Sequence, residues 1–203
     1  MKNIIGIKKG MTQIYKDDKV VPVTVVEISE NIVCGVDKAE KNCLIRIGTG
    51  KKKKPTKAEI GTYKEVKFVP KYTWDVRYDL DSCPKIGDKF GPDVLKEGDF
   101  LRIVGITKAK GFAGVVKRWG FRGGPKTHGQ SDRLRAPGSI GAGTSPGRII
   151  KGKKMAGKMG GTKQTLINKR IVEIGNDYVL IRGQVPGNVG GLLKISVMSS
   201  NEG

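Results

Sequence analysis

Three residues of the types used in nucleophilic catalysis, His128, Ser131 and Asp132, lie within five positions of one another. A working triad needs its histidine held rigidly between the nucleophile and the carboxylate. These residues instead lie in a polar, glycine-rich stretch beside Arg133 and Arg135. His128 is also the only histidine, which limits general acid–base chemistry. We therefore interpret the three residues as part of a loop and predict that the chain is not an enzyme.

A second candidate is the segment Gly147–Lys154, which nearly matches the phosphate-binding pattern GxxxxGK[ST]. Lys154 stands where that pattern requires a Ser or Thr hydroxyl to bind magnesium. No clear strand-then-helix pattern flanks the segment, so we predict no nucleotide cofactor. The alternative is that Lys151, Lys153 and Lys154 follow phosphates without sequence specificity.

The cysteines give no metal site. Cys34, Cys43 and Cys83 are spaced by 9 and 40 residues, and no CxxC pair occurs. With one histidine in the chain, a Cys/His zinc site lacks its ligands. We expect the cysteines to be small apolar residues in or beside strands, with no metal and no cofactor of any kind.

Charge is the most informative feature of the sequence. The chain of 203 residues has a net charge of +20. The window Gly105–Lys163 holds fourteen basic residues and one acidic residue, a net charge of +13, and 15 of the 30 glycines. The other 144 residues carry a net charge of only +7. A compact monomer with this charge repels itself, so the window predicts a polyanionic partner.

Aromatic residues alternate with cations in this window. Phe112, Trp119 and Phe121 lie among lysines and arginines. Flat rings that stack on bases, with cations that hold phosphates, are typical of RNA-binding surfaces, and His128 fits the same role. The alternative, equally open for Phe112 and Phe121, is that these rings anchor the segment to the rest of the protein.

The remaining chain has the pattern of β-structure. Short runs rich in Val and Ile predict strands at residues 3–8, 11–16, 20–28, 32–36, 44–48, 100–107, 170–174, 177–182 and 192–197. Asp17-Asp18, Ser29–Asn31 and Gly175-Asn176 predict turns. Residues 57–64 predict a short surface helix, and residues 63–78 indicate no secondary structure. The strands after the basic window are too few for a stable sheet, so we expect them to complete the sheet begun at the N-terminus.

This pattern predicts a mainly β protein, an antiparallel barrel or sandwich, with the basic segment inserted between strands. We place the barrel at residues 1–106 and 164–203 and the basic extension at 107–163. The run Lys51–Lys54 is open to two interpretations, a solvated loop or a phosphate contact. Apolar stretches of five residues or fewer predict no membrane contact, and the lack of a signal sequence predicts a cytoplasmic protein.

Several separated motifs resemble one family, large-subunit ribosomal protein three of the bacterial type. The similarity lies, in order, in Ile5–Tyr15 (IGIKKGMTQIY), Val21–Val25 (VPVTV), Thr107–Phe121 (TKAKGFAGVVKRWGF), Thr127–Gly129, Pro137–Gly141, Ser145–Gly147, Lys151–Gly157 (KGKKMAG) and Val185–Gly187. It covers essentially the whole chain and is weakest at residues 63–88.

The resemblance implies a β-barrel of the translation-protein type that belongs to the large ribosomal subunit and has no catalytic activity. It also implies that the basic extension penetrates large-subunit rRNA toward the peptidyl-transferase centre, and that the protein helps nucleate assembly. Implied partners are rRNA and neighbouring proteins, among them proteins fourteen and nineteen, with no membrane and no small-molecule substrate. Some relatives carry a methylated glutamine near the tip of the extension, where Thr144 stands here, so we expect no such modification.

We expect rRNA contacts from the cations of the extension, from two rings and from Thr144. These residues are Lys108, Lys110, Lys117, Arg118, Trp119, Arg122, Lys126, His128, Arg133, Arg135, Thr144, Arg148, Lys151, Lys153, Lys154, Lys158 and Lys163. The alternative function is a free-standing nucleic-acid-binding protein or RNA chaperone.

Overall fold

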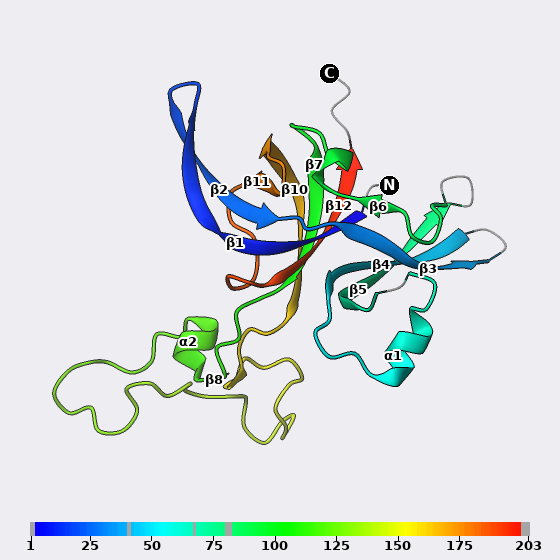
Figure 1. Ribbon diagram of the computed structural model, residues 1–203. Helices are drawn as coiled ribbons and strands as arrows, with labels where there is room; N and C mark the ends of the chain where they lie inside the picture. Colours follow the sequence, from blue (N-terminus) through cyan, green and yellow to red (C-terminus); the bar gives the residue numbers. More distant parts are fainter. Residues whose placement is uncertain (1–2, 40–41, 67, 80–82, 200–203) are drawn as a thin grey trace. The chain divides into compact units, whose positions relative to one another are not determined.

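The chain divides into two compact units. The computed structural model describes residues 3–39, 42–66, 68–79 and 83–199. Residues 1–107 and 163–203 make up the first unit, here called the barrel unit, and residues 108–162 make up the second, here called the basic unit. The basic unit therefore leaves and rejoins the chain between two strands of the barrel unit (Figure 1).

Six antiparallel strands of the barrel unit close into a barrel. They are β1 (Asn3–Lys16), β2 (Lys19–Glu27), β7 (Phe100–Ile106), β10 (Lys163–Ile174), β11 (Tyr178–Arg182) and β12 (Leu192–Ser199). Their order around the ring is β1-β12-β7-β10-β11-β2. Strands from the end of the chain therefore pair with the first two strands, as the sequence predicts, and the mainly β fold class is confirmed.

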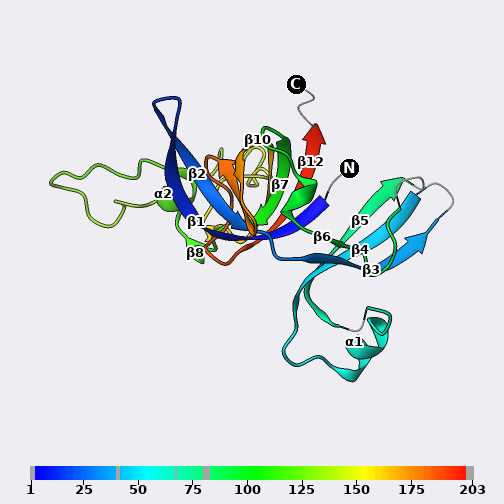
Figure 2. The ribbon, with the colours of Figure 1, turned by 45° about the horizontal axis from the view of Figure 1, so that its top comes forward.

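Two predicted strands belong elsewhere. The patterns at residues 32–36 and 44–48 suggested barrel strands, but they lie in a separate sheet of order β5-β4-β3-β6. That sheet contains β3 (Asn31–Lys38), β4 (Asn42–Lys51), β5 (Pro70–Asp79) and β6 (Lys89–Phe90), and Figure 2 shows its long strands side by side. β5 falls in the stretch for which the sequence indicated no structure. It pairs with β4, and β4 pairs in turn with β3, so these strands form a sheet of their own.

The ends of several elements also differ from the sequence patterns. Residues 3–8 and 11–16 form one strand, β1, with a register shift between Lys8 and Gly10. Strand β10 begins at Lys163, seven residues before the predicted start. The predicted surface helix is present as α1 (Lys57–Thr62), and a 3-10 turn, η2 (Pro92–Val94), precedes β7. Asp17 and Asp18 adopt φ values of 52° and 58°, the left-handed conformation of a two-residue hairpin turn.

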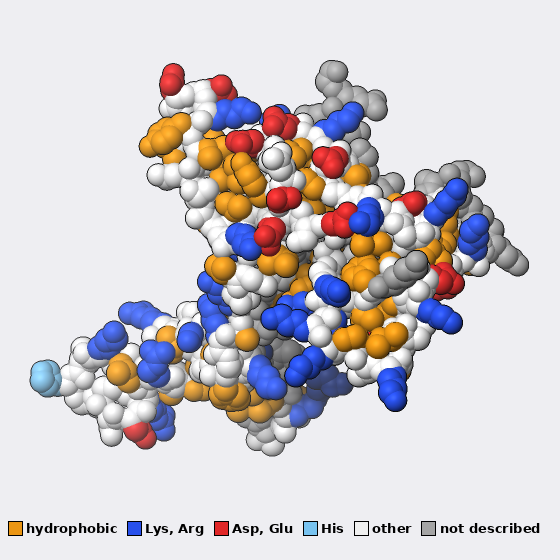
Figure 3. Space-filling model, viewed as in Figure 1, with side chains coloured by type: hydrophobic (Ala, Val, Ile, Leu, Met, Phe, Trp, Pro, Cys, Tyr) orange, Lys and Arg blue, Asp and Glu red, His pale blue; other side chains and the backbone are white. Residues whose placement is uncertain are grey.

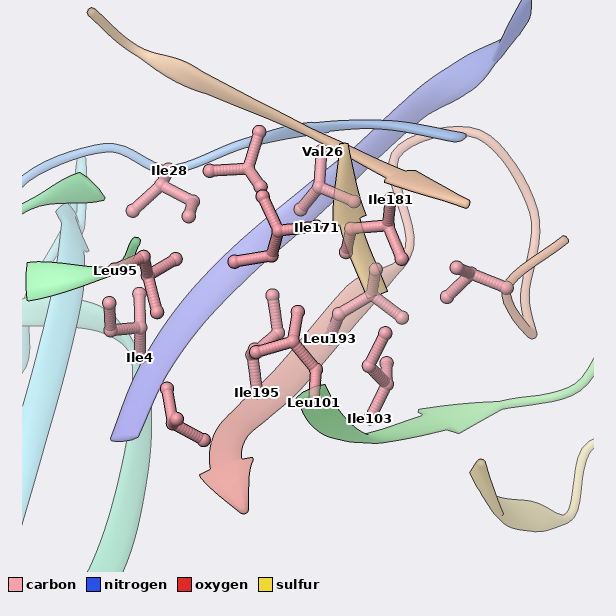
Figure 4. Packing of buried hydrophobic residues seen from close by; sticks show 13 residues of the cluster. Ile4, Val26, Ile28, Leu95, Leu101, Ile103, Ile171, Ile181, Leu193 and Ile195 are labelled. Atoms are coloured by element: carbon pink, nitrogen blue, oxygen red, sulfur yellow. The ribbon is translucent and has the colours of Figure 1, made fainter. Parts of the chain in front are cut away.

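Alternating side chains fill the barrel. Ile4, Val26, Leu101, Ile103 and Ile195 are among the residues of one fully buried cluster (Figure 4). Burial of an aliphatic side chain of this size stabilises a protein by ~1.5–3 kcal/mol, so this cluster is the main source of stability of the barrel.

A second core lies against the separate sheet. Ile5, the neighbour of Ile4 on β1, packs with Val33, Ile45 and Ile47 instead of with the barrel cluster. Successive residues of a strand point to opposite faces, so β1 contributes to both cores. Buried Asn31 joins the same region, because its side chain accepts from the Ile5 amide (3.0 Å) and donates to the Ile5 carbonyl (3.2 Å).

The cysteines lie in or beside strands, as expected, and Cys43 and Cys83 belong to this second core. Cys34 and Cys43 are buried in β3 and β4, and Cys83 is half-buried. Burial raises the pKa of the Cys34 thiol to about 11. Burial, together with a hydrogen bond with Cys83, raises the pKa of the Cys43 thiol to about 11 as well. The described residues include no group of His, Cys, Asp and Glu placed to hold a metal ion. No helix in the described part of the chain is long and apolar enough to span a membrane.

Candidate nucleic-acid interface

The basic unit begins and ends at a short paired segment, residues 108–113 with 157–160, here called the neck. Strand β8 (Phe112–Ala113) pairs with β9 (Gly157–Lys158). The amide of Lys110 donates to the Met159 carbonyl (2.8 Å), and the amide of Met159 donates to the Gly111 carbonyl (2.9 Å). At Gly160, φ is +74° and an added Cβ would lie 2.0 Å from the Lys108 carbonyl oxygen. Glycine therefore permits the close approach of the two chain segments.

One short helix follows the neck. Helix α2 (Val115–Trp119) ends at Gly120, which has a left-handed φ of 73° and donates its amide to the Val116 carbonyl (3.0 Å). Val115, the first residue of the helix, is 5% exposed, and Ala113, two residues before it, is 3% exposed. The buried start of the helix therefore fixes the positions from which Lys117, Arg118 and Trp119 extend.

Three of the predicted RNA-binding residues lie close together next to Met155, just before the second strand of the neck. The Arg118 Nη1 and Trp119 Nε1 atoms both donate to the Met155 carbonyl, each at 2.8 Å. The Arg118 guanidinium lies 4.9 Å from the centre of the Trp119 ring, and the Lys154 ammonium lies 5.7 Å from it. Arg118, Trp119 and Lys154 therefore tie the start of the loops to their end.

Between α2 and β9 the chain forms irregular loops (Figure 1). The first loop is closed where the Gly124 amide donates to the Leu134 carbonyl (2.9 Å). An added Cβ at Gly123 would lie 2.2 Å from the same oxygen. This closure holds Lys126, His128 and Arg133 in one loop.

The predicted site residues are almost all exposed. Arg118 is half-buried, and the exposed ones are Lys108, Lys110, Lys117, Trp119, Arg122, Lys126, His128, Arg133, Arg135, Thr144, Arg148, Lys151, Lys153, Lys154, Lys158 and Lys163. Apart from the cluster around Trp119, the structure distributes them along the neck and loops instead of gathering them at one point. Lys163 differs from the others because it begins β10 of the barrel unit, opposite Ile106.

The cations of the basic unit have almost no carboxylates to neutralise them. The ion pairs found among the described residues, such as Lys9–Glu27 (2.9 Å) and Arg46–Asp75 (2.8 Å), all lie in the barrel unit. Asp132 is the one acidic residue of the basic unit. Figure 3 shows the same contrast, with blue side chains predominating over red ones in that part of the molecule. The unit therefore presents an unneutralised positive surface, which suits a polyanion.

The geometry supports neither a catalytic set at His128, Ser131 and Asp132 nor a nucleotide-binding loop at Gly147–Lys154. His128, Ser131 and Asp132 are exposed, and within the described chain none of them forms a hydrogen bond with another. The Gly147–Lys154 segment forms turns, with the Lys153 amide donating to the Ile150 carbonyl (3.3 Å), and neither a strand nor a helix adjoins it. A phosphate-binding loop needs both elements.

The sequence left the roles of Phe112 and Phe121 open and did not indicate Ile150, another exposed apolar side chain of the basic unit. Phe112 is 77% exposed and Ile150 is 66% exposed, while Phe121 is half-buried. Phe112 therefore presents most of its ring to solvent, whereas Phe121 is partly enclosed. Isolated apolar residues in a stretch without a core are the signal that could have indicated this additional surface for bases and sugars.

Comparison with known proteins agrees with the geometry. The family model described as Ribosomal protein L3 matches residues 76–200. The chain is similar to "Large ribosomal subunit protein uL3" of Herpetosiphon aurantiacus, at 40% identity over 97% of this chain and 96% of that protein. It is also similar to the uL3 proteins of Thermosipho africanus (42% identity, 96% and 97% covered) and Chlorobaculum parvum (41%, 96% and 98%). Identity at this level over nearly the full length of both chains shows that this chain belongs to the ribosomal protein L3 family.

Proposed function

We propose that this protein is a structural constituent of the large ribosomal subunit whose basic unit binds large-subunit rRNA. The coarse part of this proposal rests on the family, whose members are ribosomal proteins and not enzymes. The specific part rests on one observation, the exposed and unneutralised cations of residues 108–162. In this role the protein works in the cytoplasm as part of the large subunit.

Electrostatics would supply most of the affinity. Cations on both strands of the neck, on α2 and on the loops can each displace counterions from an RNA phosphate. The glycines of the loops have no Cβ, so the backbone itself can approach a sugar–phosphate chain closely. Exposed Phe112 and Ile150 add apolar contacts to bases and sugars. RNA would then stand in for the hydrophobic core that this unit lacks.

The neck would present the loops to RNA in a defined arrangement. Because Arg118 and Trp119 are bound to the Met155 carbonyl, we assign them first to holding the loops together and second to touching RNA. The segment Gly138–Gly147, with Thr144, is exposed and carries no charge. Such a segment suits a place where RNA packs closely around it, so that its fit depends on shape more than on charge attraction. The family resemblance supports a position beside the peptidyl-transferase centre. Contacts with proteins fourteen and nineteen, and a role in nucleating assembly, belong to the same proposal.

The test removes three cations that take no part in the neck. We expect the full chain carrying Arg148→Ala, Lys151→Ala and Lys153→Ala to bind large-subunit rRNA more weakly. Each lost phosphate contact should reduce the dependence of log K on log salt concentration by ~0.7–0.9. The slope should therefore fall by about 2–3, with no change in the melting temperature of the barrel unit.

The control carries Lys16→Ala, Lys19→Ala and Lys96→Ala, three exposed lysines of the barrel unit. It loses the same charge and should keep the wild-type slope. Equal slopes in all three proteins would refute rRNA binding by the basic unit. Loss of the protein from large subunits during a high-salt wash would instead favour a free-standing nucleic-acid-binding protein.

A further inference from the structure

Five lysines surround an open groove in the barrel unit, far along the sequence from the basic unit. Lys51 ends β4, Lys52, Lys53 and Lys54 follow it, and Lys71 comes from the neighbouring strand β5. The groove has a volume of about 680 Å³, and Tyr63 and Glu59 also line it. We call it the lysine groove. Lys and Arg side chains are seen around the α1 end of the unit in Figure 3.

The lysine run is fixed to the fold. Lys51 is paired with Pro70 in the β4–β5 ladder, and the Lys52 amide donates to the Val69 carbonyl (3.0 Å). These backbone contacts fix the first two lysines of the run, Lys51 and Lys52, against the neighbouring strand β5, and Lys53 and Lys54 follow in a bend. The groove therefore has a defined shape before any ligand binds.

Helix α1 closes the other side of the groove through a capping box. The Glu59 Oε2 atom accepts from the Thr56 amide (2.9 Å), and the Thr56 hydroxyl accepts from the Glu59 amide (3.4 Å). The Lys52 ammonium donates to the other oxygen of Glu59. Lys52 is therefore already paired within the protein, and it neutralises Glu59, the one carboxylate that lines the groove.

Four lysines of the groove remain available. Lys51, Lys53, Lys54 and Lys71 are exposed, and none of them pairs with a carboxylate among the described residues. The Lys71 ammonium lies 5.0 Å from the ring of Tyr72. With five lysines and one glutamate, the lining has a net charge of +4. This is a concentrated positive site on the barrel unit.

We infer that the lysine groove binds the sugar–phosphate backbone of RNA, as a second RNA contact independent of the basic unit. The inference rests on the proposed function for the presence of rRNA. Lysine is depleted in the cores of protein–protein interfaces, whereas lysine and tyrosine commonly contact phosphates. The lysines point to RNA and not to an acidic protein, and contacts of this kind position the barrel unit without reading the base sequence.

The test uses the full chain with Lys53→Ala, Lys54→Ala and Lys71→Ala. These lysines do not hold the groove together, so the melting temperature should stay unchanged. For binding to large-subunit rRNA, the slope of log K against log salt concentration should fall by about 2–3. The matched control is again the chain with Lys16→Ala, Lys19→Ala and Lys96→Ala, which should keep the wild-type slope.

A second measurement locates the contact directly. Acetylation by a water-soluble reagent should modify Lys53, Lys54 and Lys71 in the free chain and be blocked once the chain is bound to rRNA alone. Protection that arises only in the complete subunit, and not with rRNA alone, would mean that a neighbouring protein fills the groove, and the inference would fall.

The outcomes separate this inference from the proposed function. An unchanged slope in the groove variant, with a reduced slope in the Arg148, Lys151 and Lys153 variant, would refute RNA binding by the lysine groove and support RNA binding by the basic unit. The reverse result would support the groove and refute the basic unit as the RNA-binding surface. Wild-type slopes in both variants would overturn both.

Discussion

Replacing Trp119 by Phe tests whether this side chain holds the basic unit together. The substitution removes the indole N–H that donates to the Met155 carbonyl at 2.8 Å, and it keeps an aromatic ring. If the ring acts only by stacking on RNA, the substitution should not change how often the neck opens in the free protein. If it closes the loops, the neck should open more often.

The structure sets the size of the effect. A hydrogen bond contributes about 0.5–1.5 kcal/mol to stability. Trp119 is 42% exposed, and Arg118 donates to the same carbonyl, so the lower part of this range, about 0.5–1 kcal/mol, applies. Since 1.4 kcal/mol is a factor of ten, the neck should open ~2–5 times more often. Trp119→Ala also removes the contacts with Arg118 and Lys154, each about 0.5–1 kcal/mol, so its effect should be ~10–100-fold.

Amide hydrogen exchange of the free chain measures this opening. The reporters are the amides of Lys110 and Met159, which donate across the neck. Their exchange should accelerate by the factors above, while amides in the barrel, such as that of Ile103, keep their rates.

The control is Phe112→Leu, a change at a ring that is 77% exposed, which should leave both reporters unchanged. Wild-type exchange at Lys110 and Met159 in Trp119→Phe and Trp119→Ala would refute the bracing role and leave RNA stacking as the function of the ring.

Two further predictions concern the barrel unit. Lys8 is 8% exposed, and its ammonium donates to the carbonyls of Val185 (2.6 Å) and Gly187 (3.2 Å). Because hydrogen bonds to charged groups are worth about 1.5–3 kcal/mol, Lys8→Met should lower the free energy of unfolding by about 2 kcal/mol and the melting temperature by ~4–8 °C. Calorimetry would show this, with Lys9→Met near wild type; equal melting of the two variants would count against it. The hydrogen bond from Lys52, followed by that from the Thr56 amide, lowers the pKa of Glu59. Its contribution to the start of α1 is therefore present above the unfolded-state pKa of about 4.3 and is lost as pH falls through the lower folded-state pKa. Titration by NMR should show the Thr56 amide shifting in the wild type with a midpoint below the ordinary pKa of glutamate, and no such shift in Glu59→Gln. A midpoint above that ordinary pKa would contradict the assignment.

Local sequence was sufficient for most strands, for the charged segment and for some turns. Runs of Val and Ile predict extended backbone wherever they occur, and Asp17-Asp18 predicts a hairpin turn, because both depend on the conformational preferences of neighbouring residues. Charge is additive along the chain, so a positive surface at residues 108–162 follows from composition alone. The exposure of nearly every predicted site residue follows from the same cause, since unpaired cations are costly to bury.

Tertiary structure decided which strands pair and which side chains act inside the protein. Strand propensity does not name a partner, so only the pairing of β4 with β5 places residues 42–51 outside the barrel. The composition of the basic unit marks Trp119 as an RNA-stacking ring, but its N–H reaches the Met155 carbonyl 36 residues away. In the same way, Lys52 is one of four identical neighbours in the sequence, and the fold alone pairs it with Glu59 and leaves the others exposed. Contacts between residues distant in the chain depend on the path of the whole backbone, which no local pattern contains.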